Sequence, residues 1–425
     1  MEYLLLVLAI VIPCWYAYRQ SVSGGRVEIN HVTTLTFGFL FYWVTPLAVR
    51  ILSVHIDFAL ARLWSVYFRE SLIVPYALCC LGLFLCFMLG DGLGVRWFPA
   101  RPLTSGETVP RLMLSLVTLC GCLLLLYSGY LERTNLFRHP EPGMNAIGAA
   151  RGAVTACLVL LGCAALMFSV GQRRTPWHKL LANGYFLPPL VVGAVMLWLG
   201  SRLYVASLLL MFLIYQTNLR QRLSLRWVVA AGLLFALVFG AIGSWREGSS
   251  PTSALSNVLV EPMNGSLSLV HYLRYRGISW FNAPTALMGD FQNLVPTVLM
   301  PDKYKRLKKP DAYIPVGGLH SFVSFNMNFG LAGTAVFWLL WPMLFRYLKS
   351  RMSDVLPATV YIMGSGWLAF TFFRDMFSIS LVKAIFEDSV VIPCLIVVLG
   401  RLLTAACSPE AESASLPPAE GVGAG

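Results

Sequence analysis

The sequence predicts an all-α polytopic membrane protein, and three observations lead to that fold class. Hydrophobic residues make up 57% of the 425-residue chain and charged residues only 12%, about half the charged share of soluble domains. Apolar runs that could cross a bilayer, which takes roughly 20 residues per helix, recur along the chain. Basic residues gather in the short stretches between alternate runs, as they do on the cytoplasmic side of membrane proteins.

About eleven transmembrane helices account for the apolar runs. The first run, EYLLLVLAIVIPCWYAY, has no basic residue before it, which disfavours a cleaved signal peptide. The expected spans are residues 2–18, 31–51, 72–90, 109–129, 147–170, 181–199, 203–217, 226–244, 323–345, 356–373 and 380–402. They form one polytopic transmembrane domain, residues 1–404. Residues 405–425 are small, polar and proline-bearing, which predicts a disordered cytoplasmic tail.

The distribution of charge predicts an N-terminus outside and a C-terminus inside. With that orientation, every short inner loop carries at least two basic residues. His31 falls in one of these inner loops and has no expected role. The outer side receives residues 245–322, the longest segment outside the membrane, and long loops are exempt from the charge rule. We therefore expect a large periplasmic loop inserted within the transmembrane domain.

Arg202 is the one charged residue in the apolar stretch MLWLGSRLYVASLLL. Residues 181–217 are too long for one crossing and just suffice for two, so the chain must turn near Gly200. Arg202 then lies near the outer face, where a charge costs far less than at the bilayer centre. The same reasoning places Arg374, in TFFRDMFS, and Arg246, in GSWREG, at the outer ends of helices.

Guanidinium groups that gather at one membrane surface suit a phosphate or pyrophosphate, which they bind through two parallel hydrogen bonds. The long loop adds Arg274 and Arg276, in HYLRYRG, with His271 close by. In the alternative interpretation, the arginines extend to lipid headgroups or pair with Glu247 and Asp375. The pattern predicts an anion site at the outer face, with lipid anchoring as the structural alternative.

Four short motifs occur in an order and placement that resembles the Wzy-type polymerases, the oligosaccharide repeat-unit polymerases of bacterial O-antigen and exopolysaccharide assembly. GSR at 200–202 lies at a turn between helices, and WRE at 245–247 opens the large external loop. GGLHSFVSFNMNFGLAG at 317–333 enters the next helix, and FFRD follows at 372–375. The likeness covers roughly residues 180–400 through these motifs and the whole chain through hydropathy.

The resemblance implies a reaction and a fold. A growing glycan would be transferred en bloc from undecaprenyl pyrophosphate to a new lipid-linked repeat unit, at the periplasmic face of the bacterial inner membrane. The fold would be similar to that of the polytopic lipid-linked-sugar glycosyltransferases, described as GT-C-like. The resemblance implies no nucleotide sugar, no metal and no other cofactor, with membrane lipids and no nucleic acid as partners. It leaves open whether a chain-length regulator or a flippase binds.

The resemblance also suggests a role for the arginines. Displacing a sugar from pyrophosphate develops negative charge on the leaving group, and positioned arginines stabilise that charge. Arg202, Arg246 and Arg374 would form this clamp. The loop residues that would help to bind the substrate are Arg274, Arg276, His271 and Asp290.

The acceptor hydroxyl must also lose a proton, so a general base is needed. His320 lies at the outer membrane boundary, between GGL and the ninth span, and a histidine at a helix start can equally be structural. Glu247 and Asp375 each stand beside a candidate arginine and can act as the base or orient that arginine. Related polymerases often carry an acidic residue a few positions after the GGLHS equivalent, but this chain reads SFNMN there. The base assignment therefore stays open.

Two other functions are alternatives. An O-antigen ligase would pass the finished glycan to lipid A-core, and only the acceptor distinguishes it from a polymerase. A transporter of an anionic lipid-linked solute would place charged or broken helices near the bilayer midplane, whereas the predicted charges gather at the outer ends of helices. GLAG at 330–333 predicts small-residue helix packing, and no Walker motif accompanies it, which disfavours ATP-driven transport.

Overall fold

A computed structural model describes most of the chain. The described residues are 1–54, 56, 61–99, 101, 108–131, 149–173, 175–176, 179–180, 183–198, 202–247, 254–284, 319–374 and 378–406. Within these ranges the backbone alone is described at 128–131, 149–153, 198, 202, 235–236, 239, 242–247, 254–257 and 378–379.

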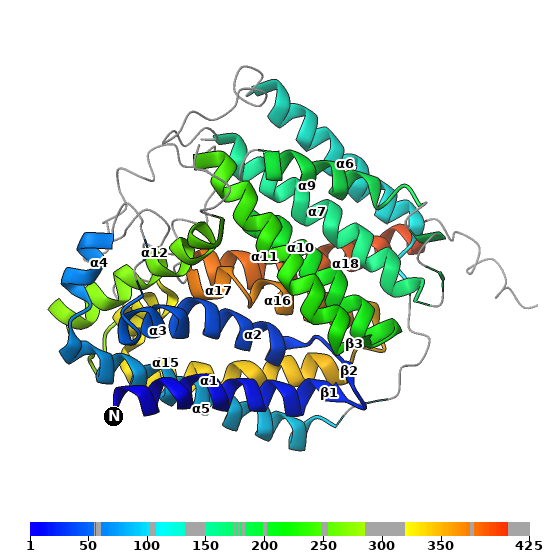
Figure 1. Ribbon diagram of the computed structural model, residues 1–425. Helices are drawn as coiled ribbons and strands as arrows, with labels where there is room; N and C mark the ends of the chain where they lie inside the picture. Colours follow the sequence, from blue (N-terminus) through cyan, green and yellow to red (C-terminus); the bar gives the residue numbers. More distant parts are fainter. Residues whose placement is uncertain are drawn as a thin grey trace, which may run out of the picture.

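Helices account for nearly all of the described chain, so the protein is an all-α membrane protein (Figure 1). Within the described residues, seven stretches of helix are long and apolar enough to cross a membrane. They are Glu2–Ser21, His31–Ile51, Glu70–Trp97, Val154–Gly171, Leu203–Arg220, Ser321–Ser350 and Ser380–Ala406. Shorter apolar helices occupy Arg111–Tyr127, Leu187–Leu197 and Leu225–Leu234. These ten helices overlap ten of the eleven predicted spans, and the helix Val355–Trp367 overlaps the eleventh. That all eleven cross the membrane stays a prediction.

The helices and strands follow one another along the chain in this order. The first half contains α1 (Glu2–Ser21), β1 (Val22–Ser23), β2 (Arg26–Val27), α2 (His31–Phe39), η1 (Leu40–Val44), α3 (Thr45–Ile51), α4 (Ala61–Tyr67), η2 (Glu70–Leu72), α5 (Ile73–Trp97), α6 (Arg111–Leu131), α7 (Ala149–Gly171) and α9 (Leu187–Trp198). The second half contains α10 (Arg202–Tyr215), η3 (Gln216–Arg220), β3 (Leu223–Ser224), α11 (Leu225–Glu247), α12 (Ala254–Tyr275), α15 (Ser321–Ser350), α16 (Val355–Trp367), α17 (Thr371–Arg374), η5 (Ser378–Val391) and α18 (Ile392–Ala406).

The two ends of the bundle differ in what they contain. At one end, to the right in Figure 1, β1, β2 and β3 pair antiparallel, with Arg26 opposite Ser224. Arg173, after α7, donates to the carbonyl oxygen of Ser353, after α15, over 2.6 Å. Four of the predicted inner loops thus meet at this end, which we call the sheet end. The opposite end, to the left in Figure 1, holds α4 and α12 and is called the α12 end.

The predicted periplasmic loop contains a helix that is built into the bundle. α12 lies near the start of the segment 245–322, and nearly all of its residues from Pro262 to Leu273 are buried. It packs against η1, α3, α4, α17 and the start of α15. The first part of the loop is therefore part of the helical body. Residues 285–318 of the loop and 407–425 of the expected tail lie outside the described residues.

Helix α15 is broken at Gly330, which adopts φ 69° and ψ −178°, a conformation that favours glycine. The segment after α12 enters the break, where the Leu331 and Ala332 amides donate to the Ser279 and Trp280 carbonyl oxygens. These bonds matter because a membrane offers no water to backbone groups that a break leaves unpaired. A Cβ at Gly330 would lie 2.4 Å from the Trp280 oxygen. GLAG thus forms a helix break at Gly330, where the sequence predicted helix packing.

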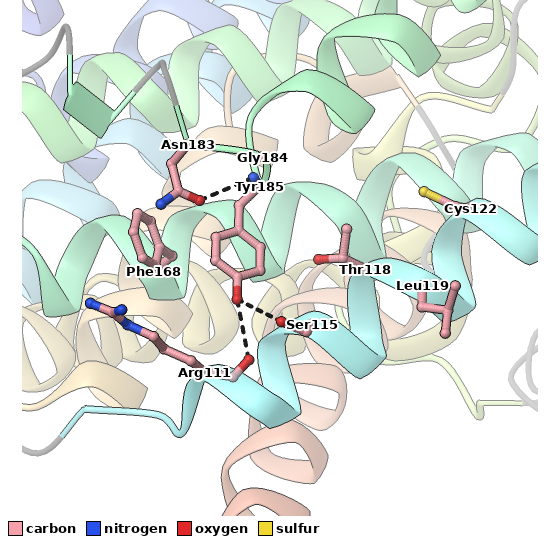
Figure 2. Close-up of a pocket in the computed structure, with 9 residues that line it drawn as sticks. All are labelled: Arg111, Ser115, Thr118, Leu119, Cys122, Phe168, Asn183, Gly184 and Tyr185. Atoms are coloured by element: carbon pink, nitrogen blue, oxygen red, sulfur yellow. Dashed lines mark hydrogen bonds between the residues drawn. The ribbon is translucent and has the colours of Figure 1, made fainter.

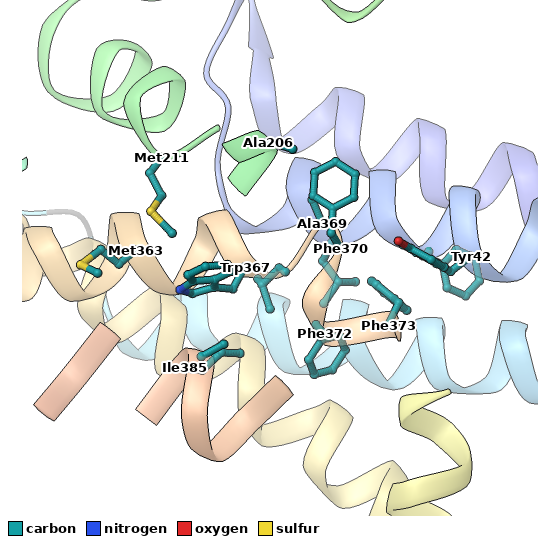
Figure 3. Close-up of a cluster of buried hydrophobic side chains, with 14 of the residues drawn as sticks. Tyr42, Ala206, Met211, Met363, Trp367, Ala369, Phe370, Phe372, Phe373 and Ile385 are labelled. Atoms are coloured by element: carbon teal, nitrogen blue, oxygen red, sulfur yellow. The ribbon is translucent and has the colours of Figure 1, made fainter. Parts of the chain in front are cut away.

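An aromatic core fixes the last predicted spans against α2 and η1. Trp43 is fully buried, and its ring centroid lies 5.8 Å from that of Trp338 and 6.4 Å from that of Phe373. Figure 3 shows Phe373 near Phe372 and Tyr42, which are also buried. A turn at 368–370 divides the predicted span 356–373 into α16 and α17. Gly38 accommodates this turn, since a Cβ there would lie 2.6 Å from the Ala369 carbonyl oxygen.

Candidate functional site

One face of α12 is lined by residues that contact the neighbouring helices. Glu261, Gly265, Ser268 and Tyr272 follow at intervals of four, three and four residues, so they share one side of the helix. We call this face the α12 stripe. At Gly265 the absent side chain admits the ring of Tyr42, whose Cδ1 atom would lie 3.5 Å from an added Cβ. The stripe extends about 16 Å along the helix, at 1.5 Å per residue.

Arg374 lies at the first position of the stripe. Its Nε atom is 2.8 Å from Oε1 of Glu261, and the two side chains are 23% and 24% exposed. Arg374 is the last residue of α17, and the preceding Phe373 is fully buried in the aromatic core. A partly exposed ion pair contributes only about 0–1 kcal/mol to stability. The pair holds the guanidinium in one orientation against α12, with part of the side chain exposed.

His320 lies at the third position of the stripe and is fully buried. Its backbone amide donates to Ser268 Oγ over 2.9 Å, and its Nδ1 accepts from the Phe322 amide at the start of α15. Because Nδ1 accepts, the proton of the neutral ring is on Nε2. Burial lowers the pKa of His320 to about 3. Adding a proton at Nδ1 would break the helix cap, so this arrangement favours a cap and hydrogen-bond donor over a general base.

The Nε2 atom of His320 is buried and has no hydrogen-bond partner among the described residues. The Trp43 ring lies beside it, with the two ring centroids 5.1 Å apart. An N–H group left unpaired in the interior costs free energy. The packing of the imidazole against Trp43 offsets the free energy lost at the unpaired N–H group.

The last position of the stripe fastens the broken helix. The Tyr272 hydroxyl donates to Oδ1 of Asn326 over 2.7 Å, and both residues are buried. The Asn326 carbonyl oxygen accepts from Nδ2 of Asn282 over 2.6 Å. The half of α15 that precedes Gly330 is thus held by α12 and by the segment that fills the break. These contacts set the position of His320, at the start of the same half-helix.

Five of the predicted site residues have side chains that lie outside the described part of the chain: Arg202, Arg246, Glu247, Asp290 and Asp375. Arg202 begins α10, and Arg246 lies in the last turn of α11, which packs against α12. The convergence of Arg202 and Arg246 on Arg374 stays a prediction.

The predicted substrate-binding residues at the end of α12 do not lie on the stripe. Arg274 donates to the Val66 carbonyl oxygen over 2.6 Å, and its guanidinium lies 5.6 Å from the centre of the Tyr67 ring. The ring of His271 contacts Tyr67 edge-on, at 5.0 Å between centroids. Arg276 is exposed and follows the end of α12. The contacts of Arg274 and His271 join α12 to α4, which is a structural role.

A second cluster of charged residues, at the sheet end, was not expected from the sequence. Asp91 of α5 is fully buried and accepts from Nε2 of His31 over 2.9 Å and from the Tyr16 hydroxyl over 2.7 Å. Arg346 donates to the same carboxylate through Nε over 2.6 Å and Nη2 over 2.7 Å. His31 is the first residue of α2, and its Nδ1 lies 3.1 Å from the Tyr361 hydroxyl. The expectation that His31 lies in a loop is therefore wrong.

Glu28 extends this cluster towards the surface. It accepts from Arg222 over 2.7 Å and forms an ion pair with Lys349. Burial acts to raise the pKa of Glu28, but the two neighbouring cations lower it overall. The cluster joins α1, α2, α5, α15 and the strand region through paired groups, so it fastens the sheet end. Its sequence signal is Asp91, an acidic residue in the apolar run FMLGDGLG, directly after the predicted end of the third span.

No family model matches the chain, and neither a curated protein nor a solved structure matches it. The functional interpretation therefore depends on the geometry of the α12 end, where Arg374 of FFRD and His320 of GGLHS both contact α12.

Proposed function

We propose that the chain polymerises oligosaccharide repeat units carried on undecaprenyl pyrophosphate. The growing glycan would be transferred from its lipid carrier to the next lipid-linked repeat unit, at the periplasmic face of the bacterial inner membrane. The observation that carries the proposal is the partly exposed pair of Arg374 and Glu261. This pair joins the FFRD motif to a helix of the predicted periplasmic loop.

The chemistry requires a positive group at the leaving pyrophosphate. An acceptor hydroxyl oxygen attacks the anomeric carbon, the bond from that carbon to the pyrophosphate oxygen breaks, and the electron pair stays on the pyrophosphate. A guanidinium that is already oriented stabilises this charge by on the order of 3 kcal/mol. Two observations support this role for Arg374: its contact with Glu261 fixes its orientation, and its side chain is partly exposed.

The acceptor proton goes to a carboxylate in this proposal. Glu247 and Asp375 keep the candidate roles that the motifs suggest. His320 is instead a positioning residue, because its Nδ1 caps α15. Glu261 adds a carboxylate at the α12 end, and its contact with Arg374 supports an orienting role.

A transporter remains the alternative from a different functional class, and one observation favours it. Broken helices commonly form binding sites in transporters, and α15 is broken at Gly330. The carbonyl groups of Ser279 and Trp280 fill this break. An O-antigen ligase would share the proposed chemistry and differ in its acceptor.

Reconstitution tests the proposal. The purified full chain is placed in liposomes with a defined undecaprenyl-pyrophosphate oligosaccharide, lipid A-core and EDTA, and the products are separated on a gel. A ladder of lengthened glycans supports the polymerase, whereas a single transfer to lipid A-core supports the ligase. Movement of labelled substrate across the bilayer without any product supports the transporter. Glycan extension that requires a divalent ion contradicts the arginine-based mechanism.

A further inference from the structure

A hollow of about 530 Å³ opens between α6, α7 and the turn before α9, away from the α12 stripe (Figure 2). It lies at the sheet end, because Thr108, just before α6, packs against Gly171 at the end of α7. Its volume is in the range of sites that hold small molecules. The polymerase proposal does not use this hollow.

The side chains that α6 contributes to the hollow change from charged to apolar along the helix. Arg111 begins the helix, Ser115 and Thr118 follow one and two turns later, and the apolar Leu119 and Cys122 come farther along α6. The distance from Arg111 to Cys122 is about 16 Å, at 1.5 Å per residue. One leaflet of a bilayer core has about the same depth, half of roughly 30 Å. A charged end at the membrane surface and an apolar end inside match the two parts of a phospholipid.

The polar end of the hollow holds one cation, Arg111, and two hydroxyl groups that bond to each other and to the backbone. The Tyr185 hydroxyl lies 2.8 Å from Ser115 Oγ and donates to the Arg111 carbonyl oxygen over 3.2 Å. Figure 2 shows this ring between Arg111 and Ser115, with Asn183 beside it. The Arg111 guanidinium makes no ion pair with a described residue, and no acidic side chain is part of the described lining. The Arg111 guanidinium is thus a cation at one end of the hollow, and a cation suits an anionic headgroup.

The outer surface of α6 faces lipid. Leu112, Leu116, Leu123 and Leu126 are between 40% and 69% exposed on this apolar helix. Leu119, which lines the hollow, is 54% exposed, so the hollow opens onto the same apolar surface as these leucines. Basic pockets between helices at the cytoplasmic surface are a recurrent way of binding anionic lipid headgroups.

We propose that this hollow binds an anionic glycerophospholipid of the leaflet at the sheet end. The phosphate pairs with the Arg111 guanidinium, and one acyl chain follows Leu119 and Cys122 along α6. The bound lipid would fill the space between α6 and α7.

Native mass spectrometry of the purified full chain tests this proposal. The protein is titrated with phosphatidylglycerol, with phosphatidylcholine of the same acyl chains, and with inorganic phosphate. We expect phosphatidylglycerol to bind about fivefold more tightly than phosphatidylcholine, the effect of one basic residue at a membrane surface. Inorganic phosphate should not compete, because it lacks the acyl chains. Equal binding of the two lipids, or displacement by inorganic phosphate, would overturn the proposal.

Three variants locate the site. Arg111→Gln should remove the preference for phosphatidylglycerol, and Cys122→Phe, which fills the apolar end, should weaken the binding of both lipids. Arg226→Gln removes an exposed cation at the start of α11, outside the hollow, and should keep the preference. All three should elute as a single folded species, because Arg111 and Arg226 are exposed and Cys122 is only half-buried. A full preference in Arg111→Gln, or its loss in Arg226→Gln, would contradict the assignment.

Discussion

Arg374 and Glu261 form an ion pair at the α12 end, with Nε of the guanidinium 2.8 Å from Oε1 of the carboxylate. The arginine belongs to the FFRD motif at the end of α17, and the glutamate to a helix of the predicted periplasmic loop. The pair therefore fixes a cation of the membrane domain against an element that the sequence places outside the membrane. This relationship connects the fold to the proposed chemistry.

Replacing Glu261 tests whether it orients Arg374. Glu261→Gln keeps the size of the side chain and removes its charge, so the charge-assisted hydrogen bond becomes a weaker neutral one. We expect the initial rate of glycan extension in liposomes to fall about tenfold, with stability changed by less than about 1 kcal/mol. Arg62→Ala, which removes an exposed cation of α4 at the same end, is the matched control and should retain the wild-type rate. An unchanged rate in Glu261→Gln would remove Glu261 from the mechanism.

His320 should make the folding stability of the protein fall in acid, because its buried ring titrates. A helix cap without a titratable ring would not have this effect. Burial lowers the pKa of the folded imidazole to about 3, whereas an unfolded chain titrates near about 6.5. The unfolded state therefore binds more protons between these values, and stability falls as the pH drops from about 6.5 towards 3. His320→Asn, which can also cap a helix, should extend glycan at neutral pH and lose less melting temperature between pH 7.5 and pH 5. Loss of extension in this variant, with normal folding, would restore the histidine as a base.

Replacing the buried Asp91 should lower the stability of the fold far more than replacing Arg222, at the exposed edge of the same cluster. Asp91→Asn leaves the charge of Arg346 buried without its counter-ion, and breaking a buried pair in this way costs about 3–5 kcal/mol. We expect a large fall in melting temperature in detergent. Arg222→Ala removes a side chain that is 44% exposed at the edge of the cluster and should cost less than about 1 kcal/mol. Similar losses in both variants would show that the buried network does not fasten the sheet end.

Gly330 should not tolerate a side chain. Gly330→Ala places a Cβ 2.4 Å from the Trp280 carbonyl oxygen at a positive φ, so the segment 278–284 must leave the break in α15. We expect lower stability and faster proteolysis of this segment. Gly82→Ala is the matched control, because Gly82 lies in α5 with nothing within 4 Å of its added Cβ, and it should be neutral or slightly stabilising. Equal behaviour of the two variants would argue against the break.

Each apolar run overlaps a helix, because a chain in a membrane must pair its backbone groups within each span. The helices α4 and α12 lie between these runs and were not predicted. The break at Gly330 could not be predicted in the same way, since carbonyl groups from residues fifty positions earlier satisfy it. The third predicted span ends at residue 90, one residue before Asp91, whereas α5 continues to Trp97 and includes this carboxylate. Only the folded chain shows that three partners surround it.

The candidate site was predictable in part. The spacing of apolar runs placed Arg374 at a helix end, and α17 ends there. Glu261 lacked such a signal, because one glutamate in a long polar segment resembles any surface residue. The repeat of Glu261, Gly265, Ser268 and Tyr272 at helical spacing was the available clue. His320 was correctly placed at the start of a helix, but its cap geometry depends on Ser268, a residue from another element.

Replacing Arg374 measures the central claim most directly. Wild-type protein, Arg374→Ala and Arg374→Lys are reconstituted at equal amounts with the same undecaprenyl-pyrophosphate oligosaccharide, and the initial rate of glycan extension is measured. The account predicts a ladder from the wild type, a loss of at least about a hundredfold in Arg374→Ala, and poor rescue by lysine, which lacks the planar fork. A wild-type ladder from a correctly folded Arg374→Ala variant would contradict it.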